Sequence, residues 1–100
     1  LGITPLMLAV ENGHIDVVRF LLRRGAQIGA RNRLNGQGVL HLAAATGHTA
    51  MIGALIAAGA GVFMEDKLGQ TARDHAARHR HRDAEQALIK VMTHQARYLH

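Results

Sequence analysis

The hydrophobic positions near the N-terminus predict two short helices in succession. Thr4 is a helix N-cap and Pro5 takes the first helical position, where its missing N–H costs nothing. The first helix is expected to run to about residue 12 and to end at Gly13, because glycine adopts a left-handed conformation easily. A second helix is expected over about residues 16–24, before Gly25. Its expected buried face consists of the apolar residues Val17, Val18, Phe20, Leu21 and Leu22.

This pattern repeats along the chain. A shift of 34 residues aligns Gly2 with Gly36, Leu6 with Leu40, Leu8 with Leu42, Ala9 with Ala43, Gly13-His14 with Gly47-His48, Leu21 with Leu55 and Gly25-Ala26 with Gly59-Ala60. A shift of 33 residues aligns Gly36 with Gly69, Ala43-Ala44 with Ala76-Ala77, His48 with His81 and Leu55-Ile56 with Leu88-Ile89. The sequence therefore predicts a repeat protein with units at about residues 1–35, 36–68 and 69–93, followed by a C-terminal tail.

The segment Ile3-Thr-Pro-Leu-Met-Leu-Ala-Val-Glu-Asn-Gly-His14, with the later Leu21-Leu22 and Gly25-Ala26, resembles the ankyrin repeat. That family has a 33-residue unit with a TPLHxA opening, a GH turn between its helices and a GA after the second helix. The resemblance implies an all-α, ankyrin-type solenoid of stacked helix pairs with short β-hairpin connections. Residues 1–100 would form one ankyrin-repeat domain, an excerpt of a longer array.

Several positions depart from the repeat. The first connection is one residue longer than the family spacing, so Leu34 or a neighbour is expected to bulge from its tip. Gly38 replaces the N-cap threonine of the first unit, which costs a side-chain cap. In the third unit Arg73 and His75 replace leucines, as expected for a terminal cap with a polar outer face. Arg80 replaces the turn glycine, which predicts a turn that is strained by about 1–2 kcal/mol or remodelled.

The composition argues against catalysis. The chain has no cysteine and no serine, which excludes a disulfide scaffold, a cysteine-ligated zinc site and the common nucleophiles. The carboxylates show no pairing for acid–base work, and Gly36-Gln-Gly38 lacks the lysine of a phosphate loop. We therefore expect no enzyme and no cofactor. The histidines at 75, 79 and 81 invite a metal site, but four neighbouring arginines would repel a cation, so no metal site is expected.

The charge of the chain points to an acidic partner. The net charge of +5 is carried mainly by ten arginines, the better residue for forked contacts to carboxylates. The resemblance implies a protein–protein interaction module that binds through a concave face of hairpin fingertips and first helices. Carried over by position, the contact residues are Glu11, Asn12, Arg31, Arg33, Leu34, Gln37, Ala45, Thr46, Lys67, Leu68, Gln70, Arg78 and His79. Arg31, Arg33, Lys67 and Arg78 together predict a partner segment with acidic character.

Other interpretations stay open at this point. The basic run from Arg73 to Arg82 could contact phosphates, which would make the chain a nucleic-acid-binding accessory module. The histidines at 75, 79 and 81 could sense pH. The uncapped N-terminal end predicts further repeats upstream or self-association. We expect an intracellular location, cytoplasmic or nuclear, without membrane insertion, and a tail that docks or frays at Tyr98 and Leu99.

Overall fold

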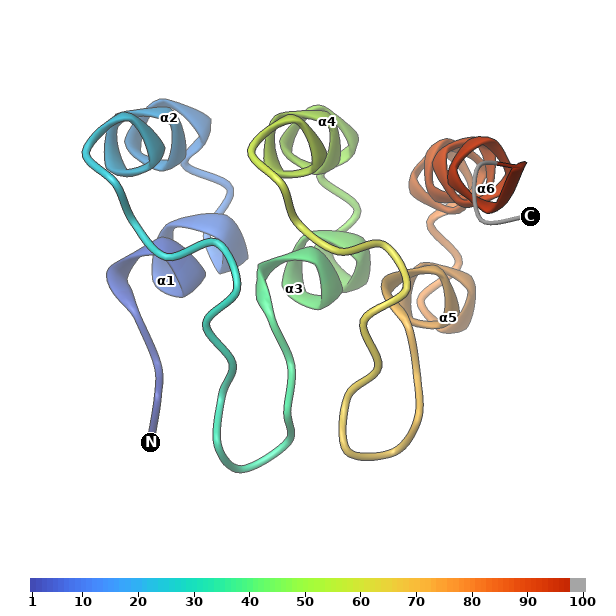
Figure 1. Ribbon diagram of the computed structural model, residues 1–100, viewed down its shortest axis with the longest axis horizontal. Coiled ribbons are helices and arrows are strands. Elements are labelled where there is room, and N and C mark those ends of the chain that lie inside the picture. The colour runs from blue at the N-terminus through green and yellow to red at the C-terminus, as the bar shows by residue number, and fades with distance from the viewer. Residues whose placement is uncertain (98–100) are drawn as a thin grey trace.

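A computed structural model describes residues 1–97, which form six helices in three pairs. The pairs are α1 (Pro5–Glu11) with α2 (Ile15–Arg23), α3 (Val39–Thr46) with α4 (Thr49–Ala57), and α5 (Ala72–Arg78) with α6 (Arg82–Arg97). Figure 1 shows the pairs side by side, with α2, α4 and α6 in one row, α1, α3 and α5 in a second row, and two long loops projecting from the second row. The predicted docking or fraying of Tyr98 and Leu99 lies outside the described residues.

The helix starts follow the N-cap prediction. Thr4 Oγ1 accepts a hydrogen bond from the Met7 N–H at 3.2 Å, and Pro5 occupies the first position. Thr71 caps α5 in the same way and also donates its backbone N–H to a carboxylate oxygen of Asp74 at 2.9 Å. Gly38 offers no side-chain cap to α3, but its N–H donates to His41 Nδ1 at 3.1 Å. At the same repeat position, the third helix pair therefore begins with a hydroxyl cap, whereas the second begins with a bond from a backbone N–H to a histidine ring.

The predicted all-α stack is confirmed, with one correction to its connections. The two long loops, residues 24–38 and 58–71, double back toward the next helix as hairpins do (Figure 1). In each loop one backbone hydrogen bond joins the two sides, from Asn32 N to Gln37 O in the first and from Asp66 N to Gln70 O in the second, both 2.9 Å. No β-strand forms within residues 1–97, so the expected β-hairpins are turns closed by few bonds.

The core lies between the two helix rows and between neighbouring pairs. α3 packs against both α1 and α5, and its Ala43 and Ala44 are fully buried, because small side chains let three helices approach closely. Leu55 on α4 and Leu88 on α6 are equally buried. α6 continues to Arg97, four residues beyond the end predicted for the third unit.

The prediction for the buried face of α2 is wrong in part. Of the five apolar residues assigned to that face, Val18 is fully buried, whereas Val17 and Phe20 are 47% and 52% exposed. The residue equivalent to Val17 in the second unit is Met51, which is 2% exposed. Helical periodicity identifies the apolar side of α2. In the second unit the equivalent side of α4 is covered by α2, but no helix pair among the described residues covers this side of α2.

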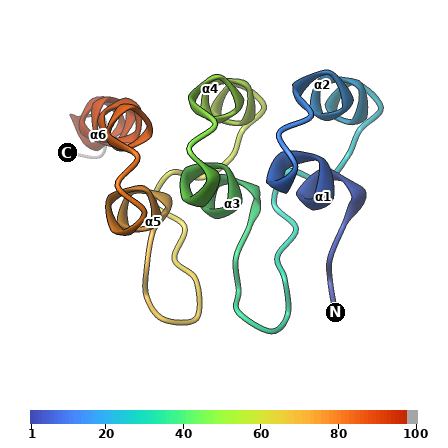
Figure 2. The same cartoon turned by 180° about the vertical axis from the view of Figure 1, so that it is seen from behind.

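The turns within the three helix pairs lie side by side, as seen from behind in Figure 2. Gly13 and Gly47 are both left-handed, with φ of 74° and 75°. A Cβ at Gly47 would lie 2.6 Å from Nδ1 of His81, so the ring of the next unit rests on the glycine. Arg80 keeps the same left-handed geometry with φ of 61°, so the third turn is strained rather than remodelled.

Membrane insertion was not expected from the sequence. None of the helices within residues 1–97 combines the length and the hydropathy that crossing a bilayer requires.

Candidate protein-interaction surface

The predicted contact residues lie on the tips of the two long loops and on the exposed ends of α1, α3 and α5. This surface is called the concave face below. All thirteen residues are exposed or half-buried. Leu34 and Leu68, at the two loop tips, are 66% and 81% exposed.

The extra residue of the first long loop is Asn35. In both loops a side-chain oxygen accepts the N–H of the tip leucine: Asn32 binds Leu34 at 2.8 Å, and Asp66 binds the second tip leucine at 2.9 Å. Asp66 also accepts the N–H of Gln70, but in the first loop the equivalent bond is made by Asn35 Oδ1 to the Gln37 N–H at 2.9 Å. The inserted residue thus closes its own turn, and the longer tip keeps the geometry of the shorter one.

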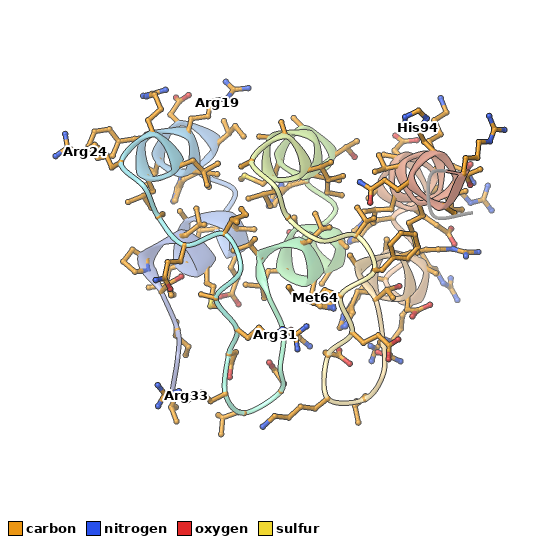
Figure 3. All side chains as sticks on the ribbon, viewed as in Figure 1. Arg19, Arg24, Arg31, Arg33, Met64 and His94 are labelled. Carbon is orange, nitrogen blue, oxygen red and sulfur yellow. The ribbon has the colours of Figure 1, made fainter. Side chains whose placement is uncertain are left out.

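The cations of the loops are not neutralised by the chain itself. Arg31 and Arg33 are exposed, and within residues 1–97 no arginine or lysine side chain pairs with a carboxylate. The ammonium group of Lys67 donates to the carbonyl oxygen of Arg33, which links the two loop tips. Figure 3 shows Arg31 and Arg33 on the first loop and Arg19 and Arg24 on the far side of α2. The concave face therefore presents positive charge to whatever lies opposite.

The helix ends supply more restrained groups. Asn12 Nδ2 donates to the carbonyl of Leu8 at 2.8 Å, and the hydroxyl of Thr46 donates to the carbonyl of Leu42 at 2.9 Å. Arg78 reaches across to the second loop, where its guanidinium donates to Oε1 of Gln70. The remaining predicted contacts there are Glu11, Ala45 and His79.

A buried polar network lies between the second and third helix pairs. His75 Nε2 is 2.8 Å from Oδ2 of Asp66, and both side chains are almost completely buried. His41 packs edge-on against the His75 ring at 5.2 Å between centroids, and its Nε2 donates to the carbonyl of Gln70 at 3.0 Å. The network ties α3, α5 and the base of the second long loop together.

Hydrogen bonding decides what this network can do. The donor atoms of His41, Asp66 and His75 lie within 4.8 Å of one another, which brings them near the spacing of a metal site. His41 Nδ1, however, accepts the N–H of Gly38, and His41 Nε2 carries the proton that is donated to Gln70, so neither ring nitrogen has a free lone pair for a metal ion. Each group already has a partner, and the residues do not fit a metal ion as well as they fit one another.

The ionisation of the network follows from its surroundings. Burial lowers the pKa of His41 below its usual value of 6.5. Burial alone would raise the pKa of Asp66, but hydrogen bonds from the Gln70 N–H, the His75 ring and the Leu68 N–H outweigh it. They lower the pKa of Asp66 from 3.8 to about 2. Asp66 is thus a carboxylate throughout the physiological range.

The sequence reasoning missed this network because it grouped His75 with its neighbours in the chain. The structure separates them: His75 is buried, while the exposed His79 stacks on His81 at 6.3 Å. His81 Nε2 lies 3.0 Å from the carbonyl oxygen of Ala45 in the preceding unit, the inter-repeat role expected for the turn histidines. The available signal was a histidine at a position that holds leucine in the first two units, together with an aspartate in the loop before it, because a buried histidine requires a hydrogen-bond partner.

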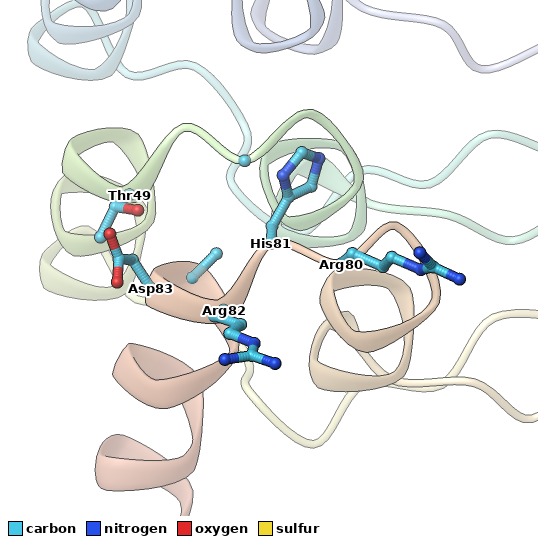
Figure 4. Close-up of a pocket in the computed structure, with 7 residues that line it drawn as sticks. Thr49, Arg80, His81, Arg82 and Asp83 are labelled. Atoms are coloured by element: carbon cyan, nitrogen blue, oxygen red, sulfur yellow. The ribbon is translucent and has the colours of Figure 1, made fainter.

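The basic run of the third unit is also divided by the structure. Arg73 and Arg78 lie on α5, whereas Arg80 and Arg82 line a hollow of about 330 Å³ at the start of α6 (Figure 4). Asp83 lines the same hollow and adds a negative charge to it. The cluster is therefore not one continuous cationic surface.

Comparison with known proteins agrees with the repeat pattern and the helix pairs. Residues 6–97 match the family model for ankyrin repeats in three copies. The chain is 33% identical over 88 residues to a transient receptor potential cation channel subfamily A member 1 homolog of Caenorhabditis elegans, covering 88% of the chain and 7% of that protein. It is 40% identical over 73 residues to glycerophosphocholine phosphodiesterase gde1 of Schizosaccharomyces pombe, covering 73% of the chain and 6% of that protein.

A mouse relative, ankyrin repeat and SAM domain-containing protein 6, is 37% identical over 73 residues, covering 73% of the chain and 8% of that protein. The chain thus spans less than a tenth of the length of each of these relatives. The chain belongs to the ankyrin-repeat family.

Proposed function

We propose that this chain is a non-catalytic module that binds an acidic segment of a partner protein on its concave face. Ankyrin repeats are generally protein–protein interaction modules. The observation that carries the finer proposal is the group of loop cations Arg31, Arg33 and Lys67. They project from the repeat stack, and no carboxylate of the described residues pairs with them. Exposed cations of one sign attract carboxylates and steer their approach.

The module needs no chemistry of its own for this role. The fold presents an extended surface rather than a closed cavity, which suits recognition of a segment of another chain. Asp66, whose pKa is lowered to about 2, is buried and hydrogen-bonded to His75, so its carboxylate is not available to a substrate. The glycerophosphocholine phosphodiesterase among the relatives is matched over only 6% of its length, so its activity does not carry over to this chain.

The test is selection of binding peptides from a random 12-residue display library on the immobilised chain. Enriched peptides should be acidic. Reversal of the three loop cations (Arg31→Glu, Arg33→Glu and Lys67→Glu) should weaken their binding by about tenfold or more, and the difference should shrink as salt is raised. Enriched peptides without acidic residues, or with equal affinity for the variant, would rule the proposal out.

The matched control reverses three arginines at α2 and its C-cap that lie away from the loop tips, Arg19, Arg23 and Arg24. This variant has the same net charge as the loop variant, so it separates a local contact from general electrostatic attraction. Equal loss of affinity in both variants would contradict a concave-face site.

A second experiment tests the nucleic-acid alternative with a DNA duplex of random sequence. Duplex binding that outcompetes the peptides and depends on Arg73, Arg78, Arg80 and Arg82 would favour that alternative.

A further inference from the structure

The concave face contains a hollow of about 270 Å³ between the first and second helix pairs. The first long loop forms one wall, and α1 forms the opposite wall. The residues that line the hollow are Ile3, Met7, Leu8, Glu11, Asn32, Asn35, Gln37 and Leu42. Its size is below the roughly 300–1,000 Å³ of sites for drug-sized ligands, and it suits a single side chain.

The hollow exists because the two interfaces between helix pairs are filled differently. Between the second and third pairs, three equivalent repeat positions hold His41, Asp66 and His75, which are buried and bonded to each other or to the loop. Between the first and second pairs the same positions hold Met7, Asn32 and Leu42. No hydrogen bond joins these last three side chains, and Asn32 uses its oxygen to close the loop tip instead. The space that the network fills at one interface is left open at the other.

The lining is apolar on one side and rich in donors on the other. The apolar side of the lining includes Leu8 of α1, which is 50% exposed, and Leu42 of α3, which is half-buried. The side-chain oxygens of Asn32 and Asn35 accept backbone N–H groups of the loop, and their NH₂ groups have no acceptor in the described residues. An apolar lining suits an aliphatic side chain of a bound peptide, and the amide groups can donate hydrogen bonds to the backbone carbonyls of that peptide.

The charges around the hollow set an orientation. The loop side carries Arg31, Arg33 and Lys67, whereas the α1 side carries Glu11. Acidic residues of a bound segment are therefore attracted on the loop side and repelled on the α1 side.

We propose that this hollow takes one leucine, isoleucine or methionine side chain of an acidic partner segment, with the acidic residues placed toward the loop tips. The inference rests on the proposed function, because it describes how the same face recognises its partner. Loop cations attract the segment, and the hollow fixes its register. An aliphatic anchor adjoining acidic residues is the recognition element.

The experiment uses the peptides selected on the unsubstituted chain. Peptides that bind should share an aliphatic residue at a fixed distance from their acidic residues. Replacing that residue by alanine in a synthetic peptide should weaken binding by about tenfold or more, as loss of two to three buried methylene groups implies. Leu8→Glu in the chain should weaken the parent peptide to a similar extent. Val17→Glu, which adds the same charge at a 47% exposed position outside the hollow, should leave binding unchanged.

The outcomes separate this inference from the proposed function. Peptides that depend on the loop cations but tolerate alanine at every aliphatic position would overturn the hollow as an anchor site and leave the acidic-segment proposal standing. Equal affinity for the Leu8→Glu chain, with its far-ultraviolet circular dichroism unchanged, would do the same. Failure to enrich any acidic peptide would overturn both. The alanine-substituted peptide needs no altered chain, so the test does not depend on whether Leu8→Glu folds.

Discussion

The buried pair of Asp66 and His75 tests how the second and third helix pairs are joined. The first and second pairs meet without such a pair, because the equivalent positions hold Asn32 and Leu42. Equivalent positions thus hold aspartate and histidine at one interface and asparagine and leucine at the other, and both combinations are accommodated by the same fold. We consider Asp66→Asn and His75→Leu, singly and together.

The magnitudes follow from the bonds that each change removes. Asn at position 66 keeps an oxygen for the N–H groups of Leu68 and Gln70, but it loses the carboxylate oxygen that lies 2.8 Å from the His75 ring. A hydrogen bond to a charged group contributes about 1.5–3 kcal/mol, so the free energy of unfolding should fall by about 1.5 kcal/mol. His75→Leu leaves a buried carboxylate oxygen unpaired, and a similar loss is expected.

The double variant should be about as stable as the unsubstituted chain. It leaves no charged group without a partner and buries a leucine where the ring was, as Asn32 and Leu42 do at the other interface, and removing both partners of a buried bond costs less than removing one. The two single losses would then couple by about 3 kcal/mol, near the upper end for residues in direct contact. Urea unfolding followed by circular dichroism at pH 7 measures this: with a slope of about 1–3 kcal/mol per molar, each single variant unfolds about 1 M earlier. A double variant as unstable as the sum of the two single losses would refute the pair as a unit.

Further predictions concern pH and the stacked turns. Because the folded-state pKa of Asp66 is about 2 against an ordinary 3.8, its stabilisation is complete above about pH 4 and is lost as the pH falls toward 2. Calorimetry should therefore show the melting temperature falling more steeply in this window for the unsubstituted chain than for Asp66→Asn; parallel curves would contradict the assigned role. Gly47→Ala should cost about 3 kcal/mol, because a Cβ that meets the His81 ring at 2.6 Å adds overpacking to the backbone strain at its positive φ. Gly25→Ala, with φ of 86° and nothing within 4 Å of its Cβ, should cost about 1 kcal/mol from backbone strain alone. Equal losses in urea unfolding would argue against the stacking. Arg80→Gly should stabilise the chain by about 0.5 kcal/mol, since relief of about 1–2 kcal/mol of strain exceeds the 0.4–1 kcal/mol of added unfolded-state entropy; no gain would mean that the turn holds no strain.

Much of the fold could be predicted because it depends on local chemistry that repeats. Thr4 caps α1 through its hydroxyl, and Gly13 and Gly47 take left-handed turns, as their residue types require. Even the strained turn at Arg80 follows from the repeat position rather than from the residue itself. The exposure of the loop tips was equally accessible to prediction, since tip residues such as Leu68 project from the stack whatever packs behind them.

The interfaces between helix pairs could not be predicted in the same way. His75 and Asp66 are nine residues apart and meet only because the second loop folds back over α5. The hollow beside Leu42 depends on the distance between two helix pairs, which no spacing along the chain encodes. The exposure of Phe20 likewise depends on what covers α2, not on the periodicity that makes its surface apolar.

The two long loops are held in different ways, and this difference bears on recognition. The second loop is anchored from beneath, because Asp66 binds both its own tip and a buried ring of α5. The first loop is closed by the side-chain oxygens of Asn32 and Asn35, with an open hollow beneath it rather than a buried partner. A loop that is anchored through a buried charge cannot move without leaving that charge unpaired. The second loop therefore provides a fixed position for Lys67. The backbone N–H of Lys67 donates to the carbonyl oxygen of Asn35 at 2.9 Å, and its ammonium group donates to the carbonyl oxygen of Arg33. The first loop is thus held at its tip by the second, and the two loops present the loop cations as one unit.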